Sequence, residues 1–312
     1  IFSSLIFFIF IIYVAAGFYL ANTILKIDPS CGLHEGALPN TWSTLVDHHE
    51  YSNINRSILR KNFPFKNYHI NDWQEVYFSS REKDIKISGW LFNYHKDQPI
   101  VIIVHGLFPN GKCKPESNLL ASLLIKNNIN ALTIDLRNYG DSSTVGNYEN
   151  LGLSEYKDVL GAFDFLNTIG FNKNQIGLHG ISLGGTSAIF AAKKEPSIKA
   201  IWLDSTLAEF KLILKDEIAR YGMPHDFGPA VSLAGKILTG IDPTKLSPAF
   251  ELTESQNYYF THGDKDLRIL THHFYFIRDF ASSNNIKADF WLAENAYHVD
   301  AMYKYPEEYS KK

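Results

Sequence analysis

One serine lies between glycines in the segment Gly180-Ile181-Ser182-Leu183-Gly184. The apolar run before it predicts a buried strand, and the small residues after it predict a helix. A hydroxyl at such a turn projects from a tight bend where backbones nearly touch, so side chains at Gly180 and Gly184 would collide. At a helix N-terminus it also lies beside N–H groups that stabilise a developing oxyanion. The segment therefore predicts a nucleophilic serine.

A base and an acid must accompany such a nucleophile. A serine hydroxyl reacts only when a base takes its proton, and an imidazole titrates in the right pH range for this. His298 lies in a loop beyond a predicted strand, after the serine and after several carboxylates. An aspartate must hold that imidazole in the productive tautomer. Asp204, Asp264 and Asp266 all follow strands, and their order in the chain leaves the choice open.

The elements that position these residues alternate from Trp73 onwards. "WQEVYFSS" and "DIKISGWLF" alternate apolar and polar residues around a charged turn, which predicts an antiparallel hairpin. Short apolar runs then alternate with helical segments; the runs are "PIVIIVHG", "ALTID", "QIGLHG", "KAIWLD", "NYYFTH" and "KADFWLA". This alternation predicts an α/β fold with a mostly parallel sheet and helices on both faces.

A long insertion, Ser205–Pro248, separates "KAIWLD" from "NYYFTH". It exceeds what a simple crossover needs. Its first helix places Leu207, Phe210, Leu214 and Ile218 at three- and four-residue intervals on one face. We expect a small helical lid in which Phe210 and Leu214 form an apolar wall of an acyl pocket. The alternative is that these helices only cover the sheet.

Five segments, in order, resemble motifs of the α/β-hydrolase-fold serine hydrolases. They are the nucleophile elbow around Ser182, "HGL" at His105–Leu107, "DLRNYGDSS" at Asp135–Ser143, "THGDKDL" at Thr261–Leu267 and "NAYHVD" at Asn295–Asp300. The resemblance covers the chain from about Trp73 to its end. It implies the α/β-hydrolase fold, with the antiparallel N-terminal hairpin and the lid as additions to the central sheet.

The resemblance also implies roles for particular residues. In the H-G-x-x-D segment that begins at His262 the acid falls on Asp266, which completes a triad with Ser182 and His298. The implied oxyanion donors are the backbone N–H groups of Leu107 and Leu183. Implied substrate contacts from the first loop are His105, Gly106 and Phe108.

The implied activity is hydrolysis of carboxylic esters or thioesters, from small molecules or lipids, through an acyl-enzyme and without a cofactor or metal. A serine aminopeptidase or prolyl-oligopeptidase-like peptidase is the alternative. Residues 26–70 are too few for the four or more blades of a β-propeller gate, but small aminopeptidases of this fold lack such a gate. A non-catalytic binding module is a second alternative, and the complete set of Ser182, Asp266 and His298 argues against it.

The first 25 residues contain no charged residue. About 20 apolar residues span a bilayer as a helix. We therefore interpret residues 1–25 as a single transmembrane anchor, residues 26–70 as a juxtamembrane connector and residues 71–312 as the hydrolase domain.

A secretory signal peptide is the alternative for this N-terminal run. Its apolar region is shorter and ends at small residues such as Ala15 and Ala16, whereas here the apolar run continues through Phe18, Tyr19 and Leu20. The flanking charges do not fix the orientation of an anchor, and we expect the hydrolase domain on the extracytoplasmic side.

Composition excludes some classes of partner. The chain of 312 residues has a net charge of -3, from 30 basic and 33 acidic residues, so no basic field for nucleic acid is expected. Cys31 and Cys113 could form at most one bridge, and we expect free thiols. "DHHE" at Asp47–Glu50 and the pair His272 and His273 lack a second ligand cluster at metal-like spacing, so no metal site is expected.

Overall fold

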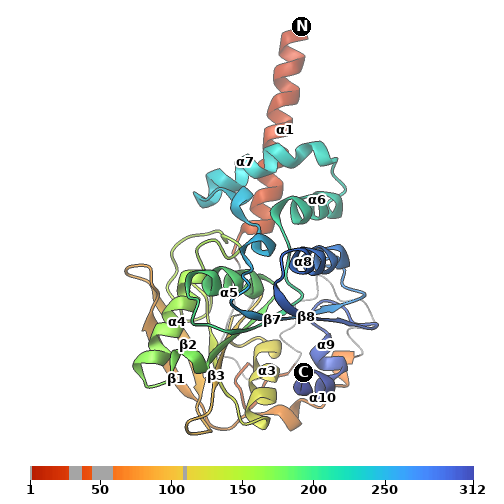
Figure 1. Cartoon of the computed structure of the whole chain (residues 1–312). Helices are drawn as coiled ribbons and strands as arrows, with labels where there is room; N and C mark the ends of the chain where they lie inside the picture. The colour runs from red at the N-terminus through yellow and green to blue at the C-terminus, as the bar shows by residue number, and fades with distance from the viewer. Residues whose placement is uncertain (1, 28–36, 44–58, 108–110) are drawn as a thin grey trace.

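A computed structural model describes residues 2–27, 37–43, 59–107 and 111–312. One eight-stranded sheet forms the centre of the described chain (Figure 1). Its strands are β1 (Gln74–Ser79), β2 (Lys86–Phe92), β3 (Ile100–Val104), β4 (Asn130–Ile134), β5 (Ile176–Ile181), β6 (Ala200–Asp204), β7 (Asn257–Gly263) and β8 (Lys287–Ala293). Their order is β1-β2-β4-β3-β5-β6-β7-β8. The pairs β1/β2 and β2/β4 are antiparallel and the others are parallel, so the expected sheet and N-terminal hairpin are confirmed.

Helices cover both faces of this sheet (Figure 1). The helices α4 (Tyr156–Thr168), α5 (Leu183–Lys194) and α8 (Thr271–Ser283) share one apolar core with the strands. The opposite core contains α3 (Pro115–Lys126), α9 (Ala301–Lys304) and α10 (Pro306–Lys311). In β3, Ile102 and Val104 face the first core and Ile103 the second. A strand that is buried on both faces needs apolar residues at every position, which explains the uninterrupted apolar segment "PIVIIV".

The described parts of the 26–70 connector belong to the folded body. Trp42, Phe63 and Ile70 are buried in the second core. The Arg60 side chain is 2% exposed and donates to Asp300 and Glu116, and its guanidinium lies over the Tyr303 ring. The connector therefore packs against α3 and the C-terminal helices. Asp47–Glu50 lie outside the described residues.

The insertion after β6 folds into two helices, α6 (Phe210–Arg220) and α7 (Gly228–Thr239). Short 3-10 helices accompany them; these are η4 (His225–Phe227), η5 (Pro243–Lys245) and η6 (Pro248–Glu251). Elsewhere in the described part of the chain lie the 3-10 helices η2 (Phe65–Tyr68) and η3 (Lys173–Gln175). The helices α6 and α7 lie at the end of the molecule opposite α10 (Figure 1). We call the segment from α6 to η5 the lid.

The N-terminal helix α1 (Phe2–Leu25) is continuous, and its second half packs against the lid. Its residues Ser4–Leu25 are long and apolar enough to cross a membrane. Its first half projects away from the molecule, whereas its second half packs on α7 (Figure 1). There Leu20, Ala21 and Leu25 are buried in one cluster with Val231 and Ala234 of α7.

Cys113 lies just before α3 and is buried. It is disulfide-bonded, so the expectation of a free thiol at this position is wrong. Cys31 lies outside the described residues. Cysteine number alone could not decide this point, because pairing depends on how the connector folds back onto the hydrolase core.

Candidate active site

Ser182 lies at the sharp turn between β5 and α5. Its backbone has φ 52° and ψ -115°, a strained conformation for a residue with a side chain. A Cβ at Gly180 would lie 2.5 Å from the Gly184 carbonyl oxygen, and one at Gly184 would collide with the carbonyl oxygens of Val104 and His105. The glycines on both sides of the serine are therefore required by close backbone approach.

The structure brings Ser182, His298 and Asp266 together, with the His298 ring between the other two side chains. His298 Nε2 lies 3.2 Å from Ser182 Oγ, and His298 Nδ1 lies 2.8 Å from Asp266 Oδ2. Ser182 follows β5, Asp266 follows β7 and His298 follows β8. The carboxyl ends of parallel strands share one edge of the sheet, which explains how residues so distant in sequence meet.

Asp266 is held as a carboxylate although it is buried. Its Oδ1 accepts hydrogen bonds from the backbone N–H groups of Arg268 (2.8 Å) and Ile269 (2.9 Å). Burial by itself would raise the pKa of Asp266, but the charge and hydrogen bond of His298 and the N–H of Ile269 outweigh it and lower the pKa to about 2. The carboxylate is thus charged throughout the range in which an imidazole titrates.

The other two candidate acids lie elsewhere. Asp204 accepts hydrogen bonds from Tyr309 and Ser205 instead of from His298. Asp264 lies on the turn after β7, where its N–H donates to Ala293. Of the three carboxylates that follow these strands, the structure therefore brings Asp266 to His298.

His262 is a further residue of the site, without an expected role. Its Nε2 donates to the Ile269 carbonyl (2.7 Å) and lies 3.4 Å from Asp266 Oδ2. Burial lowers its pKa and keeps it neutral, although the charge of Asp266 acts the other way. His262 braces the loop that carries the acid. The only signal in the sequence is its place as the first residue of H-G-x-x-D.

Of the two expected oxyanion donors, Leu183 directly follows the serine and Leu107 lies in the loop after β3. Leu183 is the first residue of α5, so its N–H has no acceptor within the helix. The loop after β3 passes close to the elbow, because a Cβ at Gly106 would lie 3.3 Å from Ser182 Cβ. Leu107 follows in that loop, and its carbonyl accepts a hydrogen bond from Lys114 (2.8 Å). Phe108 lies outside the described residues.

His105 is placed differently from the expectation. It is fully buried, its Nδ1 donates to the Gly106 carbonyl (2.7 Å) and its Nε2 accepts from the Leu136 N–H (3.0 Å). Burial lowers its pKa to about 3, so the ring is neutral. Both ring nitrogens are occupied by backbone. His105 therefore links the loop after β3 to the loop after β4 and has no nitrogen to offer a substrate.

The two expected wall residues of the lid face different clusters. Phe210 packs with Leu207, Leu246 and Ile269, next to the acid loop. Leu214 packs instead in the cluster formed by α1 and α7. The single apolar face expected from helical periodicity is thus divided, because α6 packs toward Leu246 and Ile269 on one side and toward α7 on the other.

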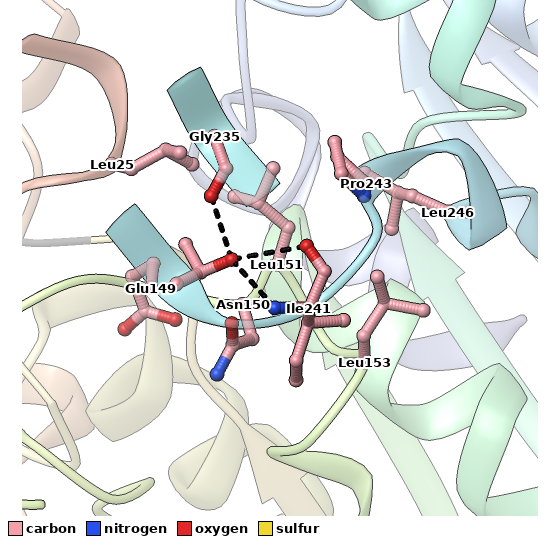
Figure 2. A pocket seen from close by; sticks show the side chains of 10 residues that line it. Leu25, Glu149, Asn150, Leu151, Leu153, Gly235, Ile241, Pro243 and Leu246 are labelled. Atoms are coloured by element: carbon pink, nitrogen blue, oxygen red, sulfur yellow. Dashed lines mark hydrogen bonds between the residues drawn. The ribbon is translucent and has the colours of Figure 1, made fainter. Parts of the chain in front are cut away.

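A small pocket lies between the end of α1, the 149–153 segment and the end of α7 (Figure 2). Its apolar lining includes Leu25, Leu151, Leu153, Ile241, Pro243 and Leu246. Leu151 and Leu153 also pack on the cluster that contains Phe210. Burial, with the nearby charge of Glu155, raises the pKa of the lining residue Glu149 well above its ordinary range. No sequence pattern pointed to this lining, since it is assembled from three separate segments.

Charged residues tie α6 to the catalytic loops. Glu217 pairs with Arg268, two residues after Asp266, and Arg220 donates to the Arg268 carbonyl (2.8 Å). Asp216 accepts from His272 (2.8 Å) and His273 (3.1 Å) at the start of α8. These pairs, which sequence reasoning did not identify, link the lid to the acid loop.

Asp216, His272 and His273 lie close enough together to be considered as a metal site. However, His273 Nδ1 accepts from the Ala208 N–H (3.0 Å), so in the neutral ring the proton is on Nε2. That nitrogen donates to Asp216 and has no lone pair for a metal. The three residues fit a hydrogen-bonded link between α6 and α8.

Comparisons with known proteins identify the fold of this chain. A sequence model of the alpha/beta hydrolase fold matches residues 99–299. An esterase of Pyrococcus furiosus superposes with a TM-score of 0.63 at 21% identity, covering 80% of this chain and 91% of that chain. Est1E of Butyrivibrio proteoclasticus with ferulic acid bound has a TM-score of 0.56 at 19% identity, over 76% of this chain and 96% of that one.

An acylaminoacyl peptidase of Pyrococcus horikoshii is also similar, with a TM-score of 0.58 at 19% identity. It covers 83% of this chain but only 42% of its own. No curated protein sequence matches the chain. The solved structures share the fold at low identity, and the family model covers most of the sheet, the serine, the acid and the histidine. The chain belongs to the α/β-hydrolase-fold family.

Proposed function

We propose that this α/β hydrolase is a membrane-anchored serine hydrolase that cleaves carboxylic esters or thioesters through an acyl-enzyme. The observation that carries the proposal is the alignment of Ser182 Oγ, His298 and Asp266, with contacts of 3.2 Å and 2.8 Å. A binding module has no need for a strained serine at a helix N-terminus whose hydroxyl faces an imidazole.

The geometry supports a defined sequence of steps. His298 Nε2 takes the proton of Ser182 Oγ as this oxygen attacks the substrate carbonyl, and Asp266 stabilises the imidazolium. The N–H groups of Leu107 and Leu183 stabilise the oxyanion. His298 then gives the proton to the departing alcohol or thiol. A water molecule, activated by His298 in the same way, releases the acid and restores the serine.

An apolar lining next to the triad favours esters with apolar acyl groups. The cluster around Phe210 contacts Ile269, whose N–H binds Asp266, and it continues through Leu151 and Leu153 to the pocket of Figure 2. Similar structures include an esterase and an enzyme with ferulic acid bound. The similarity to an acylaminoacyl peptidase keeps peptide hydrolysis as the second candidate.

The docking of α1 supports an anchor that remains part of the protein. Leu20, Ala21 and Leu25 are buried against the lid, and the helix continues without a break through Ala15 and Ala16, where a signal peptide would end. The disulfide at Cys113 favours an oxidising compartment and therefore the extracytoplasmic side.

The test combines an active-site probe with a substrate panel. A fluorophosphonate should label wild-type protein at Ser182, and p-nitrophenyl esters and acyl thioesters should be cleaved much faster than aminoacyl amides. Preferential cleavage of the amides would favour the peptidase. Absence of both labelling and turnover would favour a binding module.

A further inference from the structure

The outward face of α7 is apolar although it is exposed. Leu233 is 53% exposed and Ile237, one turn later, is 59% exposed. On the opposite face of the same helix, Ala230, Val231 and Ala234 are buried against α1. An exposed helix face in a soluble protein normally carries polar residues. We therefore ask which partner covers this apolar face of α7.

The exposed face of α7 is continuous with the exposed half of α1. Residues 5–12 of α1 are apolar and each is 47–65% exposed. Just after them α1 contacts η4, which directly precedes α7: Tyr13 donates to the Asp226 carbonyl (2.8 Å) and its ring packs on Phe227 with the ring centres 5.1 Å apart. Figure 1 shows α7 crossing α1 where the free half of α1 leaves the molecule. A membrane around the free half would also reach α7.

The charges of this region fit a helix in a membrane interface. From Phe227 to Ile241 the only charged residue is Lys236, which is exposed and pairs with Asp242 at 3.2 Å. Its long stem allows the ammonium group to stay in the headgroup layer. In α1 no charge occurs before Lys26, and Tyr19, 68% exposed, is of the type enriched at membrane interfaces. The boundary between the membrane and water is thus expected on the side of α7 that faces the sheet.

We propose that α7 lies in the membrane interface, with Leu233 and Ile237 among the lipid acyl chains, so that α1 and the lid form one lipid-binding face. The proposal rests on the proposed anchoring by α1 and adds a second membrane contact. The binding of a helix lying in the membrane interface strengthens with the apolar area that it buries among the lipids, and Leu233 and Ile237 supply such area here. Since α6 joins α7 to the acid loop, ester substrates would reach Ser182 from the lipid side.

The test reads the environment of position 233 in the full chain. The fluorophore NBD is attached to the cysteine of Leu233→Cys or, in a separate protein, of Ile237→Cys. Each labelled protein is reconstituted into phosphatidylcholine–phosphatidylglycerol vesicles. Wild-type protein treated with the same reagent is the blank. Lys96→Cys is the matched control, because Lys96 is exposed in the loop between β2 and β3, at the sheet edge opposite the lid.

We expect blue-shifted emission at 233 and 237 that spin-labelled lipids quench, and neither effect at position 96. Quenching of 233 and 237 by aqueous iodide alone would overturn the proposal. So would self-quenching that persists in detergent, since a second copy of the chain would then cover this face. Flotation of the vesicles reports separately on anchoring, and neither measurement depends on hydrolytic activity.

A second measurement concerns access to substrate. Leu233→Ser combined with Ile237→Ser should lower hydrolysis of an ester dispersed in vesicles severalfold and leave hydrolysis of soluble p-nitrophenyl acetate unchanged. Equal loss on both substrates, or no loss on either, would contradict a role of this face in reaching lipid.

Discussion

The catalytic loops and the lid lie at the same edge of the sheet, but different interactions hold them there. Around Ser182 the geometry depends on backbone atoms, with glycines at near-contact distances and N–H groups fixing Asp266. The lid is held by side chains, apolar toward α1 and charged toward Arg268. Backbone contacts pre-organise chemistry, whereas side-chain contacts can separate and re-form. The comparison predicts large, localised effects in the loops and smaller effects in the lid.

Removing the nucleophile tests the loop side most strongly. Ser182→Ala should lower kcat for a p-nitrophenyl ester on the order of 10⁶-fold, because no other group can form the acyl-enzyme. The melting temperature should not fall. Ser187→Ala, one turn later in α5, is the matched control, since its hydroxyl bonds only a helix carbonyl. Substantial turnover by Ser182→Ala would refute the triad.

The orienting acid should have the next largest effect. Asp266→Asn should lower kcat by about 10⁴-fold, because the imidazole of His298 then settles in the wrong tautomer. Asp264→Asn should change kcat far less, since Asp264 lies on the turn and its N–H bonds Ala293. If Asp264→Asn were the crippling change, the acid would be misassigned, although Ser182 and His298 could stand.

The buried carboxyl group of Asp204 should make the free energy of unfolding depend on pH. Burial, with the charges of Asp266 and Asp300, raises its pKa to about 7 against the hydrogen bonds of Tyr309 and Ser205. The folded protein then keeps a proton that the unfolded chain releases near pH 4, so the free energy of unfolding falls as pH rises from about 4 to about 7. Asp204→Asn should remove this decrease, which is at most a few kcal/mol. Asp266, with its lowered pKa, contributes no slope in that window.

Urea unfolding of wild type and Asp204→Asn across this pH range measures the effect. An equal slope in both proteins would show that Asp204 is ionised at neutral pH. The kcat of Asp204→Asn should stay within a few-fold of wild type, because its carboxylate bonds Tyr309 and Ser205 rather than His298.

The link between lid and acid loop should give a smaller effect on activity. Glu217 and Arg268 are 5% and 15% exposed in their side chains. Glu217→Gln should lower kcat about tenfold, and a cycle with Arg268→Gln should give a coupling free energy of about 1.4 kcal/mol. Lys215→Gln, exposed on the same helix, is the control. Additive effects of the two changes would mean that the pair does not transmit lid position to Asp266.

Local rules govern the turn around Ser182 and the strand β3, so their structure could be predicted from the sequence. The glycines around Ser182 and the continuous apolar β3 reflect close approach and double burial, which leave direct marks in residue type. The divided face of α6 could not be predicted, since periodicity tells which residues share a face but not that Leu214 meets α7 while Phe210 meets Ile269. His105 was misread for a related reason, because its burial depends on the Leu136 loop.

The smallest expected effect on activity concerns Phe210 and Leu214, which lie on the same helix α6 but pack in different clusters. Phe210→Ala should lower kcat/KM for a p-nitrophenyl octanoate relative to the acetate by about fourfold, the contribution of roughly one buried methylene, because Phe210 packs beside the acid loop. Leu214→Ala removes a similar apolar volume from the same helix, but its cluster is that of α1 and α7, so the octanoate-to-acetate ratio should stay near the wild-type value while the melting temperature falls. A ratio changed by Leu214→Ala and not by Phe210→Ala would place the acyl group between α6 and α7, on the membrane side of the lid.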